Sequence, residues 1–227
     1  MTSSTGATRA TAPPMTLVVA LVPVAVAVNF LANYVVALLR LPIYLDTIGT
    51  FLAAALLGPW WGALAGVLTN VVGIVPNGIS NVLFAGGSIA AALVWGYGLR
   101  SLRLGGSGVA FFVLAVVVGI VTGALATPIV LYVYGGATSH PSDLITAAFS
   151  SLGLERGVLV SSILSSIPDK VISAYIGLAV IGALPLSATR AVVLPEQPGA
   201  RRIALAVAGL IVGLVLAAVA VALQPPA

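Results

Sequence analysis

The chain has 227 residues, of which 60% are hydrophobic and 6% are charged, with a net charge of +4 and a mean hydropathy of +1.21. No soluble domain carries so much apolar surface with so few charges, so the composition indicates an all-α, polytopic membrane protein. The basic residues are scattered between apolar runs, which excludes a nucleic-acid-binding patch, and the absence of Cys excludes disulfides and thiolate metal sites.

The apolar runs are continuous and about as long as a membrane span requires, whereas a barrel would alternate with period two. Residues 1–14 are small and polar and are expected to be a disordered cytoplasmic segment. The first helix is predicted over Met15–Leu39, a run too long for a signal-peptide core and therefore expected to be retained. The other predicted helices span residues 43–57, 60–75, 82–99, 109–134, 157–184 and 203–223.

The second and third of these runs are short and are joined by Gly58-Pro59, which predicts a tight helical hairpin. Two re-entrant half-helices are the alternative. The sixth helix is predicted to be broken by Pro168-Asp169-Lys170. The organisation is then a six-helix membrane domain (15–184), a cytoplasmic loop (185–202), and an extra seventh helix with a tail (203–227).

Basic residues orient such a protein, because they favour the cytoplasmic side. A cytoplasmic N-terminus places six arginines inside and leaves Arg40 and Arg156 outside. The predicted location is the plasma membrane, with the loop over residues 135–156 facing the exterior.

Intramembrane polar residues are few, and most fall in the predicted outer half of the bundle. Because buried polar groups need partners, their convergence on one pocket open to the exterior would satisfy them and would bind a small solute. Polar contacts between helices without any ligand are the alternative. The candidate substrate-binding residues are Asn29, Asn33, Tyr44, Asp46, Thr50, Asn70, Asn77, Asn81, Asp169 and Lys170.

Asp46 is one of only five acidic residues, and an acid at the start of an apolar run is a functional-site hypothesis. Asp169 and Lys170 are neighbours, so on a helix they diverge by about 100° and are not expected to face each other. Lys170 is instead predicted to pair with Asp46. A structural ion pair, a direct contact with the ligand and a proton relay all stay open for these charges.

Signals for an enzyme are weak, and we expect none. The single His140 has no second His to form a zinc site, and neither a G-x-S-x-G elbow nor a P-loop occurs. No cofactor or metal is therefore predicted. Without a P-loop, ATP-driven work would require partner subunits.

The stretch Leu41–Gly66, which includes Pro42, Asp46 and Gly58-Pro-Trp-Trp-Gly62, resembles the substrate-binding S components of energy-coupling factor (ECF) vitamin transporters. Ile167–Lys170 and the layout of six short helices are also similar. The resemblance implies a bundle that captures a vitamin-like small molecule from outside, with loops closing over it. It also implies association with a transmembrane coupling subunit and two cytosolic ATPases.

In that family the first helix carries an Ala-x-x-x-Ala motif for the coupling subunit. This chain has Ala25, Asn29 and Asn33 at that spacing, and the seventh helix is additional. The small residues Gly58, Gly62 and Gly66 suit either close packing within the chain or docking on a membrane partner. The expected docking residues are Ala25, Gly58, Gly62 and Gly66.

Two other functions remain open at this point. A solitary secondary transporter would use Asp46, Asp169 and Lys170 for ion or proton coupling. A membrane sensor or scaffold would not transport, although no soluble signalling domain is recognisable in the sequence.

Overall fold

The structure is a computed structural model, and it describes residues 13–184 and 199–222. All regular structure in these ranges is helical, which confirms the all-α class. The α-helices are α1 (Met15–Leu38), α2 (Ile48–Leu56), α3 (Pro59–Val72), α4 (Ile74–Asn77), α5 (Ala85–Arg100), α6 (Gly108–Tyr132), α7 (Asp143–Ala148), α8 (Leu154–Ala183) and α10 (Gly199–Ala222). Three short 3-10 helices are η1 (Ile79–Phe84), η2 (Leu104–Gly106) and η3 (Ser150–Leu152).

Among the described residues, five helical segments are long and apolar enough to cross a membrane, which is consistent with a multi-pass membrane protein. They are Met15–Leu38, Pro59–Asn77, Ile79–Arg100, Gly108–Tyr132 and Leu154–Ala183. The sequence predicts six core spans and a seventh. Helices α2 and α10 are the two predicted spans that are not among these five segments. Helix α2 has nine residues and is therefore only about 14 Å long. In α10 the apolar stretch is Ala204–Val219.

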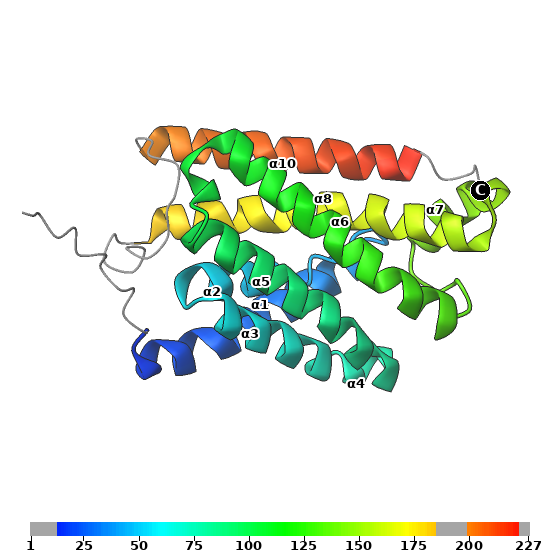
Figure 1. Ribbon diagram of the computed structural model, residues 1–227, viewed down its shortest axis with the longest axis horizontal. Helices are drawn as coiled ribbons and strands as arrows, with labels where there is room; N and C mark the ends of the chain where they lie inside the picture. Colours follow the sequence, from blue (N-terminus) through cyan, green and yellow to red (C-terminus); the bar gives the residue numbers. More distant parts are fainter. Residues whose placement is uncertain (1–12, 185–198, 223–227) are drawn as a thin grey trace, which may run out of the picture.

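The long helices lie side by side along one axis of the molecule (Figure 1). Helix α8 packs between α6 and α10, while α3 packs on α5, and α1 packs on α2 and α3. The connection from α5 to α6 lies at one end of the bundle, together with the end of α8 and the start of α10. Helices α4 and α7 lie at the opposite end.

The main apolar core occupies the half of the bundle near the α5–α6 connection. It is built on four buried aromatic rings that meet edge to face. Phe51 lies 5.3 Å from Trp95 and 6.0 Å from Phe111, and Phe111 lies 5.1 Å from Tyr175, measured between ring centroids. These rings come from α2, α5, α6 and α8 and fix the four helices against one another.

Small residues allow close contact between helices, as expected from their spacing. A Cβ atom added at Gly119 of α6 would lie 2.6 Å from Cα of Ile167 in α8, and one at Gly123 would lie 2.7 Å from Cα of Ile163. No real Cβ fits at those distances, so glycine is required where these backbones meet.

The predicted hairpin at Gly58-Pro59 is confirmed. Gly58 has φ +119, which favours glycine, and Pro59 begins α3 at a position where proline costs no backbone hydrogen bond. The second helix, however, begins at Ile48 rather than at residue 43. Residues 39–47 form a loop, because Leu45 adopts a left-handed φ of 47 and Asp169 binds its N–H.

The predicted break at Pro168-Asp169-Lys170 is wrong: α8 continues through all three residues. Proline removes one backbone hydrogen bond, but Pro168 is buried and the preceding turns are held against Gly119 and Gly123 of α6. The helix therefore stays continuous there.

Two predicted segments fall largely outside the described residues. The first is the disordered cytoplasmic segment predicted for residues 1–14, and the second is the cytoplasmic loop predicted for residues 185–202. Its last residues, 199–202, belong to α10, so that helix begins four residues before the predicted start at Ile203.

Candidate solute-binding site

A cavity of about 900 Å³ occupies the half of the bundle opposite the aromatic core. It lies between the ends of α1 and α3, the start of α5, the second half of α6 and the first half of α8. Two loops, residues 39–47 and 133–142, contribute further lining residues. The volume is in the range of sites that hold a small organic molecule.

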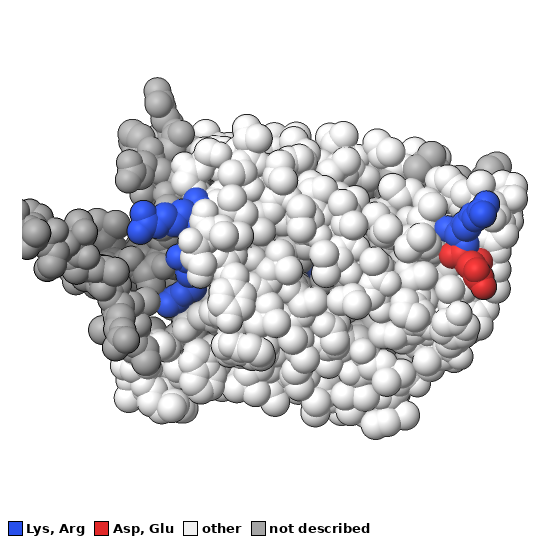
Figure 2. All heavy atoms as spheres, viewed as in Figure 1, with Lys and Arg blue, Asp and Glu red and all other residues white. Residues whose placement is uncertain are grey.

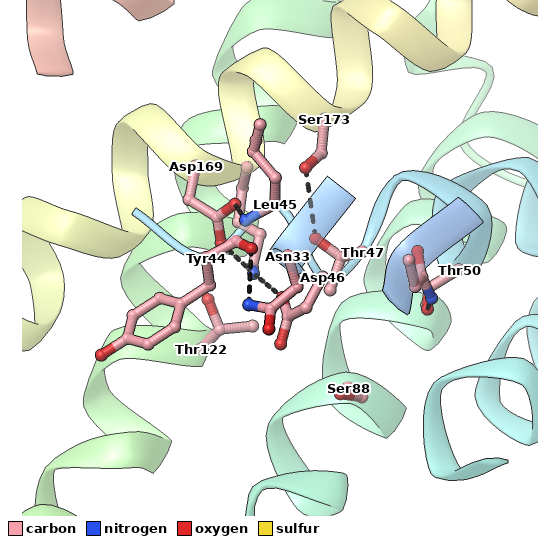
Figure 3. Close-up of polar contacts among 12 residues, drawn as sticks. Asn33, Tyr44, Leu45, Asp46, Thr47, Thr50, Ser88, Thr122, Asp169 and Ser173 are labelled. Atoms are coloured by element: carbon pink, nitrogen blue, oxygen red, sulfur yellow. Dashed lines mark hydrogen bonds and ion pairs between the residues drawn. The ribbon is translucent and has the colours of Figure 1, made fainter. Parts of the chain in front are cut away.

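The loop over residues 39–47 is fixed in place by polar contacts from both sides. Asn33 of α1 donates its side-chain N–H to the carbonyl oxygen of Tyr44 at 2.8 Å. From α8, the Oδ1 atom of Asp169 accepts the backbone N–H of Leu45 at 2.7 Å. Figure 3 shows Asp169 beside the backbone of Leu45, and Asn33 close to Asp46. Because Leu45 has a left-handed backbone, these contacts hold a conformation that the residue would not favour alone.

Lys170 joins the two acids of the site. Its Nζ lies 3.3 Å from Oδ1 of Asp46, as predicted, and it also donates to Oδ2 of Asp169. The expectation that neighbouring residues could not meet is wrong, because the flexible stem of lysine lets the ammonium fold back along its own helix. Asp169 is completely buried, whereas the Asp46 side chain is 29% exposed. Lys170 and Asp46 both line the cavity.

Tyr44 and His140 cover the cavity by stacking on each other across the two loops. Their ring centroids are 4.2 Å apart with an angle of 16° between the ring planes. The hydroxyl of Tyr44 also lies 3.2 Å from Oγ of Ser142, whose carbonyl accepts a hydrogen bond from Ser161 of α8 at 2.9 Å. The two loops and α8 are thus linked above the cavity.

Burial changes the acid–base properties of this stacked pair. Burial raises the pKa of Tyr44 to about 12. Burial also lowers the pKa of His140 to about 4, although the carboxylates of Asp143 and Asp46 oppose this change. The Nδ1 atom of His140 accepts the backbone N–H of Ser142 at 3.2 Å, and only the neutral ring has such an acceptor. Both rings are therefore neutral at pH 7.

Asparagine side chains form the opposite wall. Asn70 of α3 donates to Oγ of Ser88 on α5 at 2.8 Å and to the carbonyl of Gly66 at 2.9 Å. Asn81 donates to the backbone carbonyl of Asn70 at 2.9 Å, and Asn77 donates to Oδ1 of Asn81 at 3.4 Å. The side chain of Asn70 uses only its N–H groups in its own two contacts, and its Oδ1 atom accepts no hydrogen bond from the described residues. That oxygen is free for a ligand.

Helices α6 and α8 add hydroxyl groups that were not among the predicted site residues. Thr122, Ser162, Ser165 and Ser166 line the cavity. Ser162, Ser166 and Lys170 follow one another at intervals of four residues, which is about one helical turn. Side chains at that spacing lie on the same face of α8. A serine repeat of period four ending in a lysine was the available signal.

The ten predicted substrate-binding residues fall into two groups. Those that line the cavity are Asn33, Tyr44, Asp46, Asn70, Asn77, Asn81 and Lys170. The other three lie behind its wall: Asn29, Thr50 and Asp169 have no exposed surface. Asn29 donates to the hydroxyls of Thr50 and Thr69 at 2.9 Å each and accepts the N–H of Gly49 at 2.6 Å. All its hydrogen-bonding groups are occupied, so it joins α1, α2 and α3 instead of facing a solute.

The four predicted docking residues are buried in contacts within this chain. Ala25 faces the backbone of Gly49 in α2. A Cβ atom at Gly62 would lie 2.5 Å from that of Ala54, and one at Gly66 would lie 2.7 Å from that of Ser88. Gly58 is buried at the hairpin. Close packing inside the bundle explains all four, and docking on a partner stays a prediction.

No family model matches this chain, and no curated protein or solved structure is significantly similar to it. In the part of the chain that the structure describes, no three His, Asp or Glu side chains gather to hold a metal ion. The function therefore has to be inferred from the cavity and its residues.

Proposed function

We propose that this chain is the membrane-embedded substrate-binding subunit of an ECF-type transporter. It would capture a vitamin-like small molecule from outside the cell for ATP-driven uptake by partner subunits. The observation that carries the proposal is the cavity itself: a chamber of about 900 Å³ in an apolar helical bundle, lined by polar as well as apolar side chains and bordered by two loops. Polar groups are costly inside a membrane, and a bound solute explains why so many of them converge here.

The charge distribution supports an outward-facing cavity. Arg100 ends α5 and Arg103 follows it, so both lie at the end of the bundle remote from the cavity, and Figure 2 shows basic side chains gathered at that end. Arg201 and Arg202, in the first turn of α10, lie at that same end. Among the described residues, the cavity end has two arginines, Arg40 after α1 and Arg156 beside Glu155 at the start of α8. An excess of arginine marks the cytoplasmic side, which favours a cytoplasmic N-terminus and an external cavity mouth. A reporter fused after Arg103 should then give a cytoplasmic signal, and an external signal would reverse the assignment.

Native mass spectrometry of the purified chain tests the binding step directly. A subunit that captures a scarce nutrient is expected to retain it through purification, as an adduct of a few hundred daltons. The adduct should disappear when the protein is denatured. A protein that carries no adduct and that takes up no vitamin on incubation would count against the proposal.

A solitary secondary transporter is the second candidate, and the contact of Lys170 with two acids favours it, since such groups carry ions or protons in membrane carriers. The two candidates differ in their energy source. Uptake by cells in which this chain is the one added component, abolished by a protonophore, would support the carrier. Uptake that requires a coupling subunit and ATPases would support the ECF-type function.

A further inference from the structure

The charged cluster beside the cavity contains more negative than positive charge: Asp46 and Lys170 line the wall, and the buried Asp169 lies directly behind it. Lys170 contacts both Asp46 and Asp169, so one ammonium group faces two carboxylates. Ionised, the three groups sum to one negative charge. An unbalanced charge is costly at a site removed from water, and a cation brought by the ligand would balance it.

The two carboxylates are not equally available. Both oxygens of Asp169 are occupied, one by the N–H of Leu45 at 2.7 Å and the other by Lys170. Asp46 uses Oδ1 for Lys170, and its Oδ2 accepts no hydrogen bond from the described residues. Since Asp46 lines the cavity and is partly exposed, the free oxygen is the one that a ligand can reach.

No other charge near this point restores the balance. The ring of His140 is neutral at pH 7, because burial lowers its pKa to about 4. Arg40 also lines the cavity, but it is exposed at the end of α1, where water and salt screen its charge. Asp143 lies outside the cavity, and its Oδ2 atom accepts the backbone N–H of Thr138 at 2.8 Å.

Aromatic rings around the same cavity suit an organic cation better than a bare ion. Phe30, Phe84 and Tyr134 line it together with the stacked Tyr44 and His140. The rings of Phe84 and Tyr134 lie 6.1 Å apart between centroids. The faces of such rings attract cations, whereas a metal ion would require a compact set of oxygen ligands.

We propose that the ligand of this cavity is an organic cation of vitamin size, with Asp46 as its counter-ion. The inference rests on the proposed function, because it names the chemical class of the solute that the cavity captures. Asp169 acts as a positioning residue, since it holds Lys170 and the loop that carries Asp46 without reaching the cavity itself.

The test is competitive capture at pH 7.4 by the full-length purified protein. The probe mixture holds two cations (thiamine and pyridoxamine), two neutral compounds (riboflavin and pyridoxine) and two anions (biotin and pantothenate), at equal concentrations. After washing, the bound compound is identified by mass spectrometry. The expected result is a cation, enriched at least about tenfold over the neutral and anionic probes, as one charge-assisted contact provides.

The variant Asp46→Asn should reduce this enrichment about tenfold. Glu155→Gln is the matched control, because it removes the same charge from an exposed position at the start of α8 and should leave capture unchanged. Capture of a neutral or anionic probe would overturn the inference but leave the proposed function standing. Capture of none would count against both. The charge preference of the unaltered protein decides the matter even if Asp46→Asn fails to fold.

Discussion

Lys170 and Asp46 are 124 positions apart in the chain, and their side chains meet at 3.3 Å at the wall of the cavity. The contact connects α8 to the loop between α1 and α2, and Asp169 strengthens it by binding both Lys170 and the backbone of Leu45. One buried cluster therefore holds the loop and at the same time presents charge to the cavity.

Removing the cation of this cluster should destabilise the protein more than removing Asp46, its partly exposed anion. Lys170→Met leaves Asp169 completely buried without its partner, and breaking such a pair typically costs about 3–5 kcal/mol. Asp46→Asn leaves Lys170 paired with Asp169 and should cost about 1 kcal/mol or less. Thermal unfolding in detergent compares the two variants. Equal destabilisation would contradict the buried position of Asp169.

Asn29 and Asn33 should behave differently although they lie one turn apart on α1. Asn29→Ala leaves the N–H of Gly49 without an acceptor and removes two further hydrogen bonds, which should lower stability by about 2–3 kcal/mol. Asn33→Ala should weaken capture of a solute, because Asn33 lines the cavity and holds Tyr44. Stability and capture measured on both variants check the assignment. If folded Asn29→Ala captured less solute while Asn33→Ala captured the normal amount, the roles of the two residues would be the reverse of those assigned.

Gly62→Leu should prevent correct packing of the hairpin. Even a Cβ atom there would lie 2.5 Å from that of Ala54, so a larger side chain forces α2 and α3 apart. Gly86→Leu is the matched control, since a Cβ atom at that exposed position meets nothing within 4 Å. Size-exclusion chromatography should show loss of the monodisperse protein for the first variant only. A normal profile for Gly62→Leu would refute the close contact.

The stacked loops should become less stable in acid because of His140. Its pKa is about 4 in the folded protein, compared with an ordinary value of 6.5. Below pH 6.5 the unfolded chain binds a proton that the folded chain does not, so this stabilisation is fully present above pH 6.5 and is lost as the pH falls to about 4.

His140→Gln isolates the contribution of the histidine, because glutamine does not titrate. Thermal unfolding of the two proteins should diverge progressively between pH 6.5 and pH 4, with the unaltered chain losing more stability. Parallel curves over that interval would show that the ring is protonated in the folded state.

The sequence predicted the helical class and most helix positions, because hydropathy along the chain is a one-dimensional property. It also predicted the pairing of Lys170 with Asp46 and seven of the cavity residues, since polar groups in an apolar bundle have few places to converge. Whether each polar side chain lines the cavity or is enclosed behind its wall could not be predicted from the sequence. Asn29 and Asn33 carry the same side chain, and the rotation and packing of α1 decide that one is enclosed and the other lines the cavity.

Local rules failed where tertiary contacts override them. The start of α2 was placed five residues early, because Ile43 is apolar and buried but belongs to a loop. Pro168 was expected to break α8, but packing against α6 keeps that helix continuous. The hydroxyls of α6 and α8 were missed because serine and threonine are common in membrane helices, and a surface that faces a cavity resembles one that faces another helix.

A large side chain placed inside the cavity tests whether the cavity holds a solute. Gly87 lines the cavity and a Cβ atom there meets nothing within 4 Å, so the indole ring of Gly87→Trp should occupy part of the chamber and obstruct a solute. Gly86→Trp places the same side chain at the adjacent position, which also has open space but lies outside the cavity. Native mass spectrometry should show the solute on the unaltered protein and on Gly86→Trp, and at least about tenfold less of it on Gly87→Trp. Equal occupancy of the two folded variants would show that the solute does not bind in this cavity.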